Sequence, residues 1–175
     1  MKKNVIVFGL ISGSIVAIWM AISVAICYRS GNFEGNMLVG YASMLLAFSM
    51  VFVGVKNYRD KYSNGFVSFG KAFKLGLYIT LISSTMYVLS WLIAYYAFFP
   101  DFMAKYSAHV ISQIQKSGAT TAVIAAKIQN INTMKAMYNT LLGVVLLTYM
   151  EILPLGLIIS VITALILKRK ANAAV

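Results

Sequence analysis

The sequence predicts an all-α integral membrane protein, a four-helix bundle with an extracytoplasmic amphipathic helical hairpin between its third and fourth helices. Of the 175 residues, 61% are hydrophobic and 11% are charged, whereas a soluble domain is about 45–50% apolar and about 25% charged. Four apolar runs each approach the roughly 20 residues that cross a bilayer. The net charge is +11, and the basic residues gather at the ends of these runs, as in membrane proteins. We therefore expect one membrane domain over residues 1–175.

The first predicted span covers residues 5–27 and follows two lysines. Its apolar run exceeds the roughly 7–15 residues of a secretory signal, so we expect a retained helix. Gly9, Gly13 and Ala17 recur at every fourth position. Small residues on one face let helices approach closely in lipid. We expect this face to pack within the chain, with homodimerisation as the alternative.

The second predicted span covers residues 37–56. Gly40, Ala47 and Gly54 lie at seven-residue spacing, which predicts a second packing seam. For the chain as a whole, the expected protein partners are a second copy of the chain or another membrane protein.

The connection over residues 56–74 predicts a loop on the membrane surface, with a turn at Asn64-Gly65. Aromatic residues alternate here with basic ones, a combination typical of the headgroup zone. We expect anionic lipid head groups as partners, and the alternative is a soluble anion or a partner protein. The basic residues are Lys56, Arg59, Lys61, Lys71 and Lys74.

The third predicted span covers residues 73–98, and a helical hairpin is predicted over residues 101–138. Two runs of apolar residues at helical spacing indicate amphipathic helices, separated at Gly118. The apolar positions are Phe102, Tyr106, Val110 and Ile114 in the first run, and Ile124, Ile128, Ile131, Met134 and Tyr138 in the second. The hairpin also holds His109, which has no second ligand-type neighbour, so we expect no metal site.

The fourth predicted span covers residues 139–167, and Glu151 is its single charged residue. A carboxyl group at membrane depth is costly and usually faces a bundle interior or a wet cavity. Pro154 lacks an N–H and frees the carbonyl of Met150, and Thr148 shares the helix face of Glu151. These residues predict an intramembrane polar site. The expected hydrogen-bond partners at similar depth are Trp19, Tyr41, Ser43 and Tyr87.

Basic residues predict the orientation of the chain. Ten lie on the side that holds both termini and five on the other side, so the positive-inside rule places both termini in the cytoplasm and the hairpin outside. No Lys, Arg or His falls inside a predicted span. We therefore expect Glu151 to be protonated at neutral pH or to contact water.

Four stretches resemble a bacterial membrane protein family, domain of unknown function 4199. They are Tyr58-Arg-Asp-Lys61, Phe69-Gly-Lys-Ala-Phe73, Phe99-Pro-Asp-Phe102 and the Glu151-x-x-Pro154 pair. The resemblance covers nearly the whole chain. It implies four membrane helices in a bacterial inner membrane and carries no activity, substrate or catalytic residue.

The composition favours a non-catalytic membrane protein that binds a partner, a lipid or itself. Intramembrane catalysis needs a nucleophile with a base, two acids or metal ligands, and the spans offer one acid. We therefore expect no enzyme activity, no cofactor, no metal and no nucleic-acid partner. The alternative is a small proton- or cation-coupled transporter or channel that uses Glu151 near the helix break at Pro154.

Overall fold

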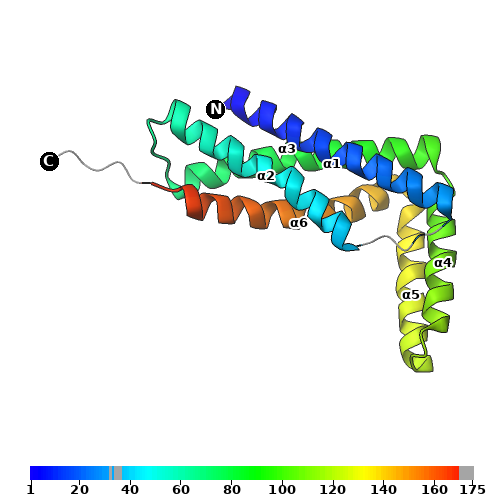
Figure 1. Cartoon of the computed structure of the whole chain (residues 1–175). Helices are drawn as coiled ribbons and strands as arrows, with labels where there is room; N and C mark the ends of the chain where they lie inside the picture. The colour runs from blue at the N-terminus through cyan, green and yellow to red at the C-terminus, as the bar shows by residue number, and fades with distance from the viewer. Residues whose placement is uncertain (32, 34–36, 170–175) are drawn as a thin grey trace.

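The described part of the chain is helical and contains four helices long and apolar enough to cross a membrane (Figure 1). The computed structural model describes residues 1–31, 33 and 37–169. The spanning candidates are Lys2–Ser30, Val39–Tyr62, Phe69–Phe98 and Leu141–Leu167. Each of the four predicted spans therefore corresponds to a helix that could cross a membrane by length and composition. Lys170, which entered the count of basic residues, lies outside the described residues.

The candidate spanning helices are α1 (Lys2–Ser30), α2 (Met37–Tyr62), α3 (Phe69–Ile93) and α6 (Leu141–Leu167), and a π-helical turn, η1 (Ala94–Phe98), extends α3. Helix α3 packs against both α1 and α6. It buries small and hydroxylated residues along its length, which allow both neighbours to approach closely. The core of the bundle therefore lies around α3.

The connection between α2 and α3 differs from the predicted surface loop over residues 56–74. Helix α2 continues to Tyr62 and α3 begins at Phe69. Both helices therefore extend beyond their apolar stretches into polar sequence, and the connection between them is shorter than predicted. The connecting turn has positive φ angles at Asn64 (48°) and Gly65 (80°), as the Asn-Gly pair predicts. Val67 then pairs with Arg169 through N···O distances of 3.2 and 2.9 Å. The turn and the end of α6 therefore meet at one end of the bundle.

Helices α4 (Phe102–Lys116) and α5 (Thr121–Tyr138) form a hairpin at the opposite end. Figure 1 shows the pair side by side and directed across the long helices, at the end far from Met1 and from the C-terminal end of α6. Gly118 in the turn has a φ of 69°. The apolar positions expected to form the hairpin faces are all half-buried, and Met103 and Ser107 are buried with them. The hairpin thus directs its apolar side toward the partner helix and the bundle.

The small-residue seam of α1 contacts α3. A Cβ atom built at Gly9 would lie 2.8 Å from Ile82, and one at Gly13 would lie 2.9 Å from the Cβ of Met86. Ala17 is half-buried. The four-residue spacing on α1 therefore meets a matching spacing on α3.

The seam of α2 is shorter than its seven-residue pattern predicts. Ala47 is buried, and its carbonyl accepts a 2.8 Å hydrogen bond from Ser12 of α1. A Cβ at Gly54 would lie 2.7 Å from Ile79. Gly40, by contrast, has no described atom within 4 Å of its would-be Cβ. Among the described residues, the predicted seam therefore makes close contacts at Ala47 and Gly54 and none at Gly40, which lines the smaller cavity described below.

Candidate functional site

Glu151 lies on the third turn of α6, about 15 Å along the helix from Leu141 at 1.5 Å per residue. Its side chain is exposed rather than packed in the bundle interior. The next residue, Ile152, is fully buried. Glu151 is accessible because it borders two cavities, so the carboxyl group contacts space instead of a packed neighbour.

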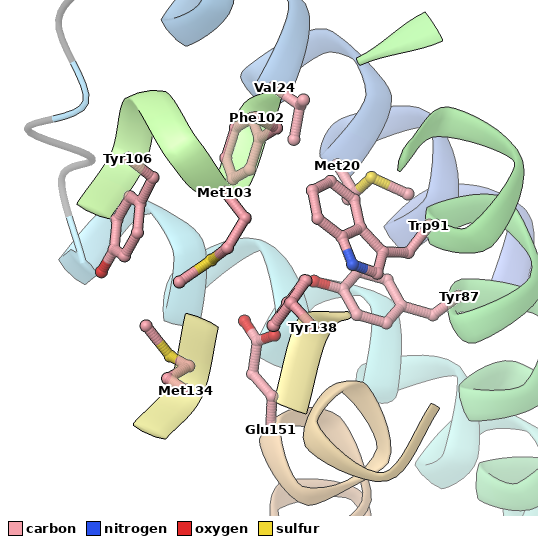
Figure 2. Close-up of a pocket in the computed structure, with 10 residues that line it drawn as sticks. All are labelled: Met20, Val24, Tyr87, Trp91, Phe102, Met103, Tyr106, Met134, Tyr138 and Glu151. Carbon is pink, nitrogen blue, oxygen red and sulfur yellow. The ribbon is translucent and has the colours of Figure 1, made fainter. Parts of the chain in front are cut away.

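The larger cavity has a volume of about 390 Å³ and lies where the hairpin crosses the bundle. Figure 2 shows its side chains converging from α1, α3, α4, α5 and α6. Ligand sites in proteins commonly measure about 300–1,000 Å³ and are mostly apolar with few polar groups. The cavity fits this description. Its lining comprises Met20, Val24, Tyr87, Trp91, Phe102, Met103, Tyr106, Met134, Tyr138 and Glu151.

The carboxyl group of Glu151 points from α6 toward Tyr87 and Tyr138 (Figure 2). Tyr87 of α3 is its hydrogen-bonding neighbour. Tyr138, at the end of α5, forms a side-chain hydrogen bond with Trp91. Burial raises the pKa of the Tyr138 phenol to about 12, so this phenol stays neutral near pH 7. The acid therefore lies beside the neutral phenol of Tyr138.

A smaller cavity of about 150 Å³ meets the same carboxyl group from the side of α2. Tyr87, Met20 and Val24 line both cavities. Of the expected partners of Glu151, Trp19 and Ser43 line the smaller cavity, and Ser43 donates to the carbonyl of Gly40 at 2.6 Å. Tyr41 lines neither cavity and is 49% exposed. Glu151 and Tyr87 thus form a shared wall between the two spaces.

The other two residues of the predicted polar site do not join the cavity. Thr148 is buried and donates a 2.7 Å hydrogen bond to the carbonyl of Val144 in its own helix. Pro154 is exposed within α6, which runs through it without ending. Only Glu151 of the predicted trio lines the cavity.

The hairpin residues of the cavity were not singled out as a site by the sequence. Phe102, Tyr106, Met134 and Tyr138 were expected on apolar helix faces, and Met103 was not part of either pattern. Their role depends on the direction in which the hairpin crosses the bundle, which local periodicity does not encode. The single usable signal was the density of aromatic residues between Trp91 and Tyr106.

The predicted headgroup residues lie at the opposite end of the bundle. Lys56, Lys61, Lys71 and Lys74 are exposed, and the ammonium group of Lys71 lies 5.2 Å from the centre of the Tyr58 ring. Arg59 differs from them because it is buried and forms a 2.6 Å ion pair with Asp60. Four of the five predicted cations are therefore available to anionic head groups.

Among the described residues, no group of three His, Cys, Asp or Glu side chains could hold a metal ion. His109 is half-buried in the hairpin, and its ring centre lies 6.0 Å from that of Phe33. The described residues therefore offer no metal site, and the carboxyl group of Glu151 is the one acidic group among the described residues that line the cavity.

Comparison with known proteins identifies a family without assigning an activity. No curated protein and no solved structure matches the chain. One family profile, described as a protein of unknown function (DUF4199), matches residues 7–169. Because this match covers nearly the whole sequence, the chain belongs to the DUF4199 family.

Proposed function

We propose that the protein is a non-catalytic membrane protein that binds a small lipid-like molecule in the cavity beside Glu151. The observation that carries this proposal is the cavity of about 390 Å³ between the bundle and the hairpin. Three methionines line it, and methionine side chains adapt to irregular apolar ligands. The polar groups at Glu151, Tyr87 and Tyr138 lie together and would orient such a ligand.

The lining offers little for catalysis. Among the described residues, it contains one carboxyl group, three phenols and an indole, with no Ser, Cys, His or second acid. Acid–base and nucleophilic mechanisms need paired groups within hydrogen-bonding reach. These features favour binding over reaction.

The core beneath Glu151 favours a binding site over a transport route. Ile152, Phe48 and Thr80 are fully buried on the side that faces the opposite end of the bundle. Thr80 also donates a 3.2 Å hydrogen bond to the carbonyl of Gly156. An ion leaving Glu151 in this direction would have to open a packed interface.

The charge distribution supports a location in the bacterial cytoplasmic membrane with both termini in the cytoplasm. The exposed lysines near the α2–α3 turn would then face anionic head groups. The hairpin and the opening of the larger cavity would lie on the outer side. A ligand would therefore enter from the outer leaflet or from the space beyond it.

A titration of the purified full-length protein in dodecyl maltoside tests the binding proposal. The probe is neopentylbenzene, an uncharged molecule with an aromatic ring and a bulky alkyl group. Trp91 lines the larger cavity and Trp19 the smaller one, so intrinsic tryptophan emission reports occupancy without a label. We expect a saturable change in emission beyond that produced by partitioning into micelles.

A cavity-filling variant provides the specific test. Val24 lines both cavities, so Val24→Phe should remove the saturable phase. Ile22→Phe is the matched control, because Ile22 lies on the same helix, is 51% exposed and lines neither cavity. Equal saturable binding by wild type and Val24→Phe would refute the cavity as the binding site.

A further inference from the structure

Glu151 differs from the other described acidic residues in its pairing. Asp60 pairs with Arg59 at 2.6 Å, and Asp101 pairs with Lys105 at 2.9 Å. Within the part of the chain that the structure describes, Glu151 has no such ion pair, and no Lys, Arg or His lines the larger cavity. A protein with a net charge of +11 therefore directs an unpaired acid into a small-molecule cavity.

Aromatic rings surround the space in front of this acid. Five of the ten lining residues are aromatic. The ring centres of Trp91 and Phe102 lie 5.2 Å apart at 83°, and those of Phe102 and Tyr106 lie 6.1 Å apart and stack. Tyr87 and Tyr138 add rings on the side of Glu151 (Figure 2). The rings thus come from α3, α4 and α5 toward one space.

This combination has a definite chemical preference. The face of an aromatic ring attracts a cation within about 6 Å, and cages of such rings bind quaternary ammonium groups. A carboxylate supplies the opposite charge, which has greater effect where water is scarce. An anionic head group would instead meet the negative faces of the rings and the acid.

We propose that the cavity binds an organic cation, a protonated or quaternary amine with an apolar body, with its charge beside Glu151 and its body among the methionines. This inference rests on the binding function proposed above and specifies its ligand class. Two sources carry such a group: the head group of an amine-containing lipid and a free amphiphilic cation. The larger cavity, at about 390 Å³, has room for the ammonium group and a ring or short chain.

The test compares two probes of the same shape. Benzyltrimethylammonium carries a quaternary nitrogen, and neopentylbenzene has carbon in its place. Both are titrated into the full-length protein in dodecyl maltoside, whose head group has no amine, with tryptophan emission as readout. We expect wild type to bind the cation at least about tenfold more tightly than its neutral isostere.

Charge removal at Glu151 should abolish this preference. We expect Glu151→Gln to weaken cation binding about tenfold or more and to change neopentylbenzene binding little. Tyr149→Phe is the control on the same helix, because Tyr149 does not line the cavity. Tyr138 lies outside the spans, so Tyr138→Leu tests the contribution of the rings independently. This variant should weaken binding of the cation more than binding of the neutral isostere.

The outcomes separate this inference from the proposed function. Similar affinities for both probes, unchanged in Glu151→Gln, would overturn cation recognition while leaving apolar binding intact. Absence of saturable binding for both probes would refute both proposals. Competition by phosphatidylethanolamine, and not by phosphatidylglycerol, would support the inference with a lipid head group as the source. If neither lipid competes with the probe and the protein still prefers the cation to its isostere, the result would support a free organic cation as the source.

Discussion

At the scale of single residues, sequence reasoning identified the acid of the site and could not describe its surroundings. Placing an isolated carboxyl group at membrane depth costs free energy, so such a residue usually has a function. The sequence correctly proposed Tyr87 as a neighbour of Glu151. The sequence predicts that Glu151 faces a bundle interior or a wet cavity, and the structure places it beside two cavities. Sequence alone could not choose between these surroundings, because the larger cavity depends on how the hairpin crosses the bundle. The small residues differ in the same way, because Cβ atoms built at Gly9 and Gly13 would clash with α3, whereas one built at Gly40 would have no described atom within 4 Å.

Gly156 shows how little space the core beneath the site contains. A Cβ atom there would overlap the methyl group of Thr80 and lie 2.8 Å from the Phe48 ring. Both neighbours are fully buried, so neither can move without cost. We expect Gly156→Ala to lower the free energy of unfolding by about 1–3 kcal/mol, measured by denaturant titration in mixed micelles.

Gly70→Ala is the matched control for this prediction. Gly70 also lies in a helix, and its would-be Cβ has no neighbour within 4 Å. Alanine favours helix over glycine, so the stability of this variant should be unchanged or slightly raised. Equal stability of Gly156→Ala and wild type would show that α3 and α6 are packed less closely than described.

At the scale of elements, the number and type of helices could be read from apolar length and periodicity. Their ends could not, because α2 and α3 extend into basic, aromatic sequence that resembles a surface loop. The faces of the hairpin were predictable from four-residue spacing. Its crossing direction was not, because it depends on contacts at the corner, where Tyr28 of α1 donates a 2.5 Å hydrogen bond to Asp101.

Tyr28, Asp101 and Lys105 contact one another at the start of α4. Besides the hydrogen bond from Tyr28, Lys105 contacts Asp101 at 2.9 Å, and the Lys105 ammonium group lies 4.1 Å from the centre of the Tyr28 ring. The hydrogen bond from Tyr28, followed by that from Lys105, lowers the pKa of Asp101 below its usual value of 3.8. The attachment therefore contributes fully above that value and is lost as pH falls through the lowered pKa.

Tyr28→Phe should raise the pKa of Asp101 toward its usual value, because the variant removes the hydroxyl donor and keeps the ring. Carboxyl-carbon NMR of labelled aspartate measures this pKa directly. Tyr41→Phe, a change at an exposed tyrosine of α2, should leave it unaltered. An Asp101 pKa that is the same in wild type and Tyr28→Phe would contradict the described corner.

At the scale of the whole molecule, the chain carries most of its basic residues at the end of the bundle opposite the cavity. Both described chain ends and the α2–α3 turn lie at one end of the bundle, and the hairpin and cavity lie at the other (Figure 1). The unequal distribution of basic residues is visible in the sequence, so the sequence alone predicts which helix ends lie on the same side. The cavity could not, because its ten lining residues come from five helices.

Accessibility of single cysteines tests the proposed orientation. Cys27 is the only cysteine, so Cys27→Ser provides a background for Ser63→Cys in the α2–α3 turn and Ser117→Cys at the hairpin tip. An impermeant maleimide should label Ser117→Cys in cells with an intact cytoplasmic membrane. It should label Ser63→Cys only after that membrane is permeabilised. The reverse pattern would invert the proposed topology.

The central claim is that the space beside Glu151 is a ligand site, and it is tested most directly by tryptophan emission of the unaltered protein during titration with neopentylbenzene. A saturable change that Val24→Phe removes and Ile22→Phe retains is the predicted result. An emission change that rises linearly with probe concentration in all three proteins would show only partitioning into the micelle, and would contradict the claim.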